Sequence, residues 1–221
     1  MRESRKTTLV KVCGMTTAED TTLCARLGAD LVGFIFHRSS PRNITPARAA
    51  AIPSFGMIRV GVFVQQSVDE VLAIMNQARL DMAQLHGDQD ESFCKGVGPE
   101  QVIRVFWPGR YSGQGEFRTE LSRFARCCTY ALLDAGTSGG GHGTSMDLSL
   151  LHDISIPMPW FLAGGLGPDT IGPALSHCSP QGVDLNSGVE SSPGKKDEKK
   201  LCQTLEKVRS SDPSHVEPTL D

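Results

Sequence analysis

The chain has 221 residues, with 22 Lys and Arg against 25 Asp and Glu, which gives a net charge of −3. This balance excludes a strongly basic chain that binds nucleic acid through its charge. The apolar runs are far shorter than a membrane span, and the polar start of the chain lacks the apolar stretch of a signal peptide. We therefore expect a cytoplasmic protein without a nucleic-acid or membrane partner.

The chain contains seven Cys, an odd number, with neither a C-x-x-C motif nor zinc spacing. The six His form no pair at metal spacing. A disulfide framework is not expected at this length, so the thiols are predicted to be free and mostly buried. No metal site is predicted.

Eight short apolar runs recur along the whole chain. They are almost continuously apolar rather than alternating, which indicates strands buried on both faces, as in a parallel sheet. The predicted strands lie at 9–14, 30–36, 57–64, 80–87, 101–107, 129–135, 159–165 and 182–188.

Segments with helical spacing lie between these runs. Thr16 or Thr17 can cap a helix over 18–28, and Ser67 with Glu70 forms a capping box for another.

Two more helices are predicted near the end of the chain. Pro168 suits the first turn of one, and apolar residues at 201, 205 and 208 mark the other.

Eight strand–helix units in about 200 residues predict an α/β fold, a single-domain (β/α)₈ TIM barrel over 9–209. An open doubly wound sheet is the alternative, although it more often has five or six strands. The polar segments 1–8 and 210–221 are expected to be disordered tails. The glycine-rich loops 108–118 and 136–146 each follow a strand, so in a barrel they lie on the catalytic face.

Two strand ends carry groups suited to acid–base chemistry. Cys13 ends the first strand, where a buried apolar role is the common one and a reactive thiol needs a nearby cation or helix terminus. Asp134 ends the sixth strand after four apolar residues. It is either a functional carboxylate or a turn residue that opens the next loop.

Other strand ends carry groups suited to binding an anion. Arg42 lies in the loop after the second strand. Its guanidinium either binds a carboxylate or phosphate through two hydrogen bonds, or is simply solvated. The glycine-rich segments after strands seven and eight, AGGLGPDT at 163–170 and DLNSGVE at 184–190, are placed where barrels commonly bind phosphate.

The chain resembles the phosphoribosylanthranilate isomerase family of tryptophan biosynthesis. The matching motifs are KVCG, SPR, QLHGD, AGGL and NSGVESSPGKKD, which occur in that order within residues 9–209. The resemblance implies a (β/α)₈ barrel and the Amadori rearrangement of N-(5-phosphoribosyl)anthranilate to 1-(2-carboxyphenylamino)-1-deoxyribulose 5-phosphate. It also implies a monomer or homodimer that needs no cofactor.

The resemblance assigns a role to each candidate residue. Cys13 becomes the general base and Asp134 the general acid, with a lowered and a raised pKa respectively. Arg42 binds the anthranilate carboxylate, and His86 and Asp184 contact or orient the substrate. The phosphate rests on Gly164, Gly165, Asn186, Ser187 and Gly188.

The chain departs from many relatives at Thr144–Asp147, at Asn186 and at His37 with Arg38, which affects loops and affinity rather than the reaction class. Two rival functions remain. One is a different phosphosugar barrel enzyme, and the other is a non-catalytic phospho-ligand binding protein.

Overall fold

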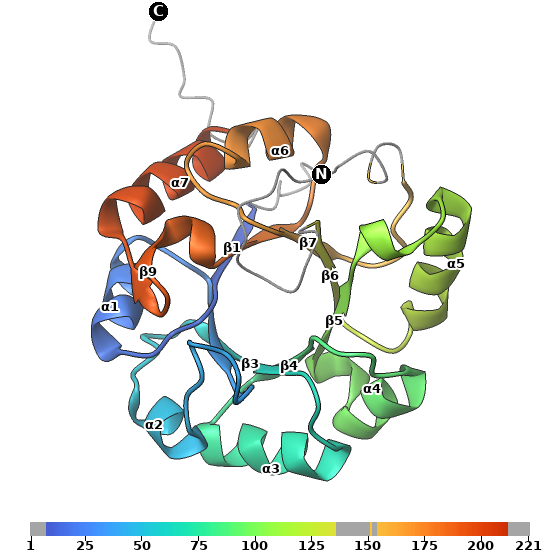
Figure 1. The fold of residues 1–221 in the computed structure, drawn as a ribbon, viewed down its shortest axis with the longest axis horizontal. Helices are drawn as coiled ribbons and strands as arrows, with labels where there is room; N and C mark the ends of the chain where they lie inside the picture. Colours follow the sequence, from blue (N-terminus) through green and yellow to red (C-terminus); the bar gives the residue numbers. More distant parts are fainter. Residues whose placement is uncertain (1–7, 136–150, 152–153, 212–221) are drawn as a thin grey trace, which may run out of the picture.

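The computed structural model describes residues 8–135, 151 and 154–211. Eight parallel strands form a closed barrel in the order β1 to β8, and β1 pairs with β8 to complete the ring (Figure 1). The strands are β1 Leu9–Val12, β2 Leu31–Ile35, β3 Ile58–Phe63, β4 Met82–Leu85, β5 Val102–Phe106, β6 Tyr130–Asp134, β7 Trp160–Ala163 and β8 Gly182–Leu185. The predicted α/β TIM barrel and all eight predicted strands are confirmed, whereas the open sheet is wrong.

Each strand is buried on both faces, which explains the continuous apolar runs. One set of alternate residues fills the barrel interior, including Leu31, Val60, Ile103, Leu132 and Phe161. The other set packs outward against the helices and forms the larger part of the core. Lys11 and Cys13 follow the inward alternation of β1, and Cys13 packs on the inward residues Ile35 and Val62.

Helices surround the barrel (Figure 1). They are α1 Ala18–Arg26, α2 Pro46–Ala51, α3 Val68–Ala78, α4 Glu91–Val97, α5 Gln114–Phe124, α6 Ile171–His177 and α7 Glu198–Ser210.

Local hydrogen bonds explain where two of these helices begin. The Thr17 hydroxyl accepts from the Asp20 N–H at the start of α1. Ser67 and Glu70 form the predicted capping box at the start of α3.

The structure differs from the prediction at two places near the C-terminus. Pro168 lies in a turn ahead of α6 rather than in its first turn, and the helix begins only at Ile171. A small hairpin of β9 Glu190–Ser192 and β10 Lys195–Lys196 follows β8, although its polar sequence gave no strand signal. The hairpin brings Glu190 and Lys196 into the buried part of the molecule.

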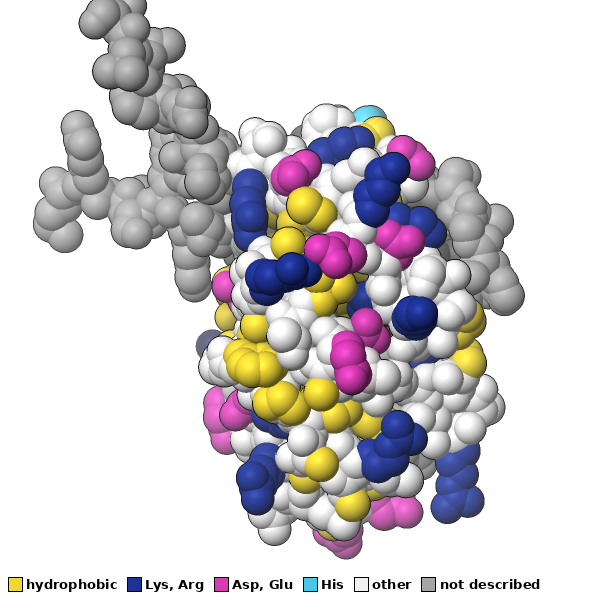
Figure 2. All heavy atoms as spheres, turned by 90° about the vertical axis from the view of Figure 1, so that its left-hand side faces the viewer, with side chains coloured by type: hydrophobic (Ala, Val, Ile, Leu, Met, Phe, Trp, Pro, Cys, Tyr) yellow, Lys and Arg dark blue, Asp and Glu magenta, His cyan; other side chains and the backbone are white. Residues whose placement is uncertain are grey.

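One face of the outer surface carries mixed charges. Figure 2 shows one face on which basic and acidic side chains are interspersed, with no extended field of one sign. Within the described residues, no helix is both long enough and apolar enough to cross a bilayer. The predicted tails at 1–8 and 210–221, the glycine-rich loop at 136–146 and the departures at Thr144–Asp147 fall wholly or largely outside the described residues.

Candidate active site

The barrel topology places every strand's carboxyl end at the same mouth, which is where barrel enzymes build their sites. Cys13 and Asp134 reach this mouth from β1 and β6, and His86 and Asn186 reach it from β4 and β8. Cys13 and Asp134 are only 4% and 7% exposed, so both reactive groups are largely withdrawn from bulk water. Their ionisation therefore depends on neighbouring protein groups.

Cys13 is held tightly at the end of β1. Its N–H donates to the carbonyl of Leu185 at 2.8 Å, which continues the pairing of β1 with β8. Burial raises the pKa of the Cys13 thiol above its ordinary value, and the charge of Lys11 opposes that rise. The pKa of the thiol in the ligand-free protein is thus raised rather than lowered, because loss of hydration outweighs the nearby cation.

Lys11 lies one inward position below Cys13 and is completely buried. Its Nζ donates to Asp184 Oδ1 at 2.8 Å. Burial alone would lower the pKa of Lys11, but the charges of Asp184 and Cys13 outweigh it and raise that pKa. Asp184, at the end of β8, is therefore occupied by an ion pair inside the barrel.

Gly33 on β2 supplies the space in which Cys13 and Lys11 meet. A Cβ atom at this position would lie 2.7 Å from Cys13 Sγ and 3.2 Å from Lys11 Nζ. We expect Gly33→Ala to lower kcat at least tenfold and to destabilise the fold by about 1–3 kcal/mol, because the added methyl must displace the thiol. Steady-state kinetics and urea unfolding measure the two effects.

Gly172→Ala is the matched control for this prediction, because a Cβ atom at that helical position meets nothing within 4 Å. It should leave kcat unchanged. A Gly33→Ala variant with the kinetics of the Gly172→Ala variant would contradict the tight contact described here.

His86 lies beside Asp134, and Trp107 packs against His86. His86 Nε2 is 4.0 Å from Asp134 Oδ2, and its Nδ1 lies 3.2 Å from the Gln84 amide nitrogen. Burial, reinforced by the charge of Lys11, lowers the pKa of His86 to about 4, so the imidazole is neutral near pH 7. The Trp107 ring meets it edge to face, with 5.4 Å between the ring centroids.

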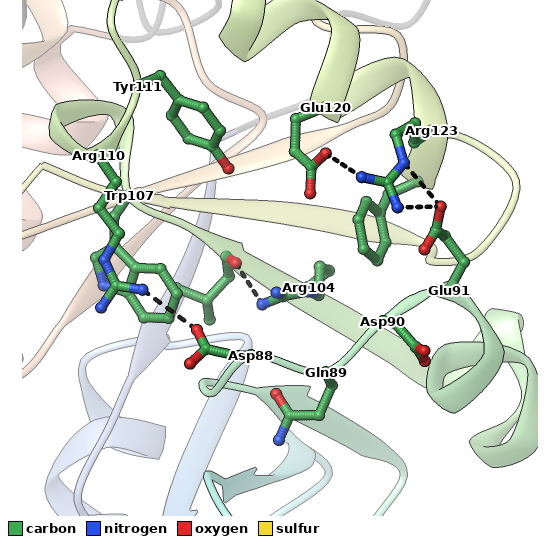
Figure 3. A pocket seen from close by; sticks show the side chains of 12 residues that line it. Asp88, Gln89, Asp90, Glu91, Arg104, Trp107, Arg110, Tyr111, Glu120 and Arg123 are labelled. Atoms are coloured by element: carbon green, nitrogen blue, oxygen red, sulfur yellow. Dashed lines mark hydrogen bonds and ion pairs between the residues drawn. The ribbon is translucent and has the colours of Figure 1, made fainter.

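A separate polar pocket of about 220 Å³ lies behind Trp107, between the ends of β4 and β5 and helices α4 and α5 (Figure 3). The Arg110 guanidinium stacks 3.9 Å from the Trp107 ring centroid and pairs with Asp88 at 3.4 Å. Arg123 on the far side pairs with carboxylates at 2.7 Å. The exposed arginines of this pocket, Arg110 and Arg123, are therefore already engaged with carboxylates.

Arg42 is brought to the mouth by the loop after β2. Its Nε and Nη2 donate to the buried Glu190 carboxylate at 2.9 and 2.5 Å, which leaves Nη1 outside this pair. The hydrogen bonds to Glu190 raise the pKa of Arg42, and the charge of Cys13 acts in the same direction. Glu190 also accepts from Lys196 Nζ at 2.8 Å and from the Gly194 N–H at 3.2 Å.

The two glycine-rich segments lie against each other. A Cβ atom at Gly188 would lie 2.1 Å from the carbonyl oxygen of Leu166, so the two backbones are in direct contact. Gly164 and Gly165 have φ of 110° and 68°, a conformation that favours glycine. Ser187 and Gly188 begin a 3₁₀ helix, whose first N–H groups have no acceptor within the helix.

The structure thus brings the predicted residues to one end of the barrel, although Asp184 is paired with Lys11 and Arg42 with Glu190. The sequence analysis gave no site role to Lys11, Glu190, Lys196 and Trp107, although Glu190 and Lys196 lie within the motif NSGVESSPGKKD. For Lys11 the available signal was a charge in the middle of an apolar strand, since such a charge needs a buried partner.

A closed parallel barrel with this set of groups at its carboxyl mouth defines a (β/α)₈-barrel enzyme. The family model for N-(5'-phosphoribosyl)anthranilate (PRA) isomerase matches residues 10–207. The chain belongs to the phosphoribosylanthranilate isomerase family.

Individual relatives agree with this assignment. The N-(5'-phosphoribosyl)anthranilate isomerase of Maridesulfovibrio salexigens is 54% identical over 194 residues, which cover 88% of this chain and 95% of the relative. The crystal structure of the Thermotoga maritima enzyme is 32% identical with a TM-score of 0.81, and the match covers 92% of this chain and 99% of that one.

One solved relative holds a ligand. A phosphoribosyl anthranilate isomerase in complex with reduced 1-(o-carboxyphenylamino)-1-deoxyribulose 5-phosphate is 30% identical with a TM-score of 0.78. The match covers 92% of this chain and 99% of that one.

Proposed function

We propose that this chain performs the Amadori rearrangement of N-(5-phosphoribosyl)anthranilate through two groups, Asp134 as general acid and Cys13 as general base. The observation that carries this proposal is their placement, since both are inward-facing and largely buried at the ends of β1 and β6 of one barrel. A carboxyl and a thiol on different strands can act on the ring oxygen and on C2′ of one bound sugar, the two atoms that flank C1′.

The acid acts first. Asp134 gives its proton to the furanose ring oxygen as the bond from that oxygen to C1′ breaks, and the anilino nitrogen supplies the electron pair that forms the iminium. Asp134 is only 7% exposed and the neutral His86 lies beside it, so its contact with water is limited. A carboxyl that is poorly hydrated favours the protonated form, which is the form an acid needs.

The base acts second. The Cys13 thiolate removes the proton from C2′. The C–H electron pair then forms the C1′–C2′ double bond and the π pair of the iminium moves onto its nitrogen, giving an enolamine. Transfer of a proton to C1′ and loss of the C2′ hydroxyl proton give the ketone product. The iminium accepts the electrons in this sequence, so the chemistry requires no metal or coenzyme.

The phosphate is bound at the two adjoining glycine-rich segments. The N–H groups of Ser187 and Gly188 begin the 3₁₀ helix after β8, and the Gly164–Gly165 backbone adjoins them, so these donors, with Asn186 beside them, suit a dianion. Binding at this remote group is the same for substrate and product. Its role is to hold the sugar so that the reacting carbons meet Cys13 and Asp134.

Arg42 is proposed to bind the anthranilate carboxylate through Nη1, with Glu190 fixing the guanidinium plane. We expect Arg42→Ala to raise KM by about tenfold or more with a smaller change in kcat, because a charge-assisted hydrogen bond contributes about 1.5–3 kcal/mol. The loss of anthranilate-type fluorescence during turnover measures both constants.

Arg118→Ala is the control for this prediction, since Arg118 is an exposed arginine on α5, away from the loop after β2. It should leave KM unchanged. An unchanged KM in the Arg42→Ala variant would contradict the carboxylate role.

The fluorescence assay also tests the proposed function as a whole. Consumption of N-(5-phosphoribosyl)anthranilate by the purified chain is the expected result. Binding of reduced 1-(o-carboxyphenylamino)-1-deoxyribulose 5-phosphate without turnover of substrate would instead favour a phospho-ligand binding protein.

The proposal also includes a quaternary structure and a cellular location. The Thermotoga maritima enzyme is described as dimeric, and a monomer or homodimer in the cytoplasm is proposed for this chain. Sedimentation velocity over a range of concentrations tests the first point, and fractionation of cells tests the second.

A further inference from the structure

We propose that Lys11 is a positioning residue for the base, whose buried ammonium, anchored by Asp184, stabilises the thiolate of Cys13. This inference rests on the proposed role of Cys13. It concerns a group that does not reach the substrate, because Lys11 has no exposed surface and lies below the thiol inside the barrel.

The first support is the burial of the lysine. A lysine with 0% exposure at the barrel axis loses its hydration, which is a large cost for a side chain with no structural need to be charged. Asp184 offsets part of that cost through a 2.8 Å contact. An apolar pair would often stabilise a barrel interior equally well or better, so stability alone does not explain this ion pair.

The second support is the contact between the lysine and the thiol. Both side chains close around Gly33, where a Cβ atom would lie 2.7 Å from Cys13 Sγ and 3.2 Å from Lys11 Nζ. The thiol and the ammonium are therefore neighbours across the space left by that glycine. A cation at this range favours a thiolate over a thiol.

The third support is the balance of charges around Cys13. Among the described residues, four charged groups act on its ionisation: Lys11 on the same strand, Asp184 on β8, Lys196 on β10 and Arg42 in the loop after β2. Lys11 lowers the pKa of the thiol most strongly among the cations that act on it, while Asp184 raises that pKa less strongly. The ion pair therefore has a net effect in favour of the thiolate, although its total charge is zero.

The test measures the ionisation of the thiol itself. The rate of alkylation of Cys13 by iodoacetamide is followed from pH 6 to pH 10, with the label assigned to Cys13 by peptide fragmentation. Cys24, with no exposed surface and a pKa raised to about 12 by burial, is an internal control within the same chain. Reduced 1-(o-carboxyphenylamino)-1-deoxyribulose 5-phosphate should protect Cys13 from the label.

In Lys11→Met, the pH dependence of Cys13 labelling is expected to move to higher pH by about one to three units, as for loss of an adjacent opposite charge. Labelling at pH 8 should fall at least tenfold. The kcat of Lys11→Met at neutral pH should be at least tenfold lower than that of the wild type. Its KM should change less than threefold, because Lys11 does not contact the substrate. A folded Lys11→Met variant whose thiol labels with the wild-type pH dependence overturns the inference.

Two further variants keep the test decisive. Lys11→Met leaves Asp184 buried without its ion-pair partner, so this variant can fail to fold. The double variant Lys11→Met/Asp184→Asn removes both charges. Labelling of Cys13 in the double variant should also move to higher pH. Asp184→Asn alone keeps the lysine, and its labelling should not move to higher pH. An upward shift in Asp184→Asn as large as in Lys11→Met would show that disturbed packing is responsible, and would overturn the inference.

Failure of the proposed function gives a different result. If Cys13→Ser keeps its turnover, Cys13 is not the base, whatever the labelling shows. If Cys13→Ser is inactive but labelling in Lys11→Met is unchanged, the base is correct and the role of Lys11 is wrong.

Discussion

Asp134→Asn is expected to lower kcat by about 10²–10⁴-fold, the range that positioned acid–base groups contribute. Asparagine keeps the shape of the side chain at the end of β6 but cannot deliver a proton to the ring oxygen. Because this group acts on the sugar ring and not on the phosphate, KM should change little. The loss of substrate fluorescence gives kcat, and urea unfolding shows whether the barrel is intact.

Asp88→Asn is the control for this substitution, since Asp88 follows β4 at the same end of the barrel but its side chain is 92% exposed. It should retain wild-type kcat. An Asp134→Asn variant with more than a third of wild-type kcat would exclude Asp134 as the acid.

Cys13→Ser is the second substitution with a large expected effect. A hydroxyl is a far weaker acid than a thiol, so it cannot provide the anion that removes the C2′ proton, and kcat should fall by about 10²–10⁴-fold. Serine is also a small change, because it replaces only the sulfur atom of Cys13 by oxygen. Calorimetry with reduced 1-(o-carboxyphenylamino)-1-deoxyribulose 5-phosphate should show that binding persists.

Cys24→Ser separates chemistry from packing. Cys24 has no exposed surface and lies on α1, away from the barrel mouth. Placing a hydroxyl there should destabilise the fold and leave kcat within twofold of wild type. Similar kcat losses in both cysteine variants would mean that the effect at Cys13 is one of folding.

The strands could be predicted because a strand that is buried on both faces consists of consecutive apolar residues. Each of the eight runs corresponds to one observed strand within a few residues. The hairpin β9–β10 could not be found in this way, since Ser192 and Lys195 pair at the surface without an apolar face. Pro168 was misplaced because a proline fits a turn as well as a first helical turn.

The members of the site could be placed at strand ends, but not their partners. Lys11 pairs with a residue 173 positions away, and Arg42 pairs with one 148 positions away. Local spacing carries no information about such pairs, which exist only after the barrel has closed. The direction of the Cys13 pKa was wrong for the same reason, since burial is set by the whole fold.

The pairing of β1 with β8 also has a consequence for how the chain folds during synthesis. The first strand leaves the ribosome with an unpaired edge, and Lys11 has no counterion until Asp184 has been translated. Until then the nascent sheet exposes an edge able to pair with other chains. Pairing of β8 covers that edge and gives the lysine its counterion, so the barrel can close only after Gly182–Leu185 have been made.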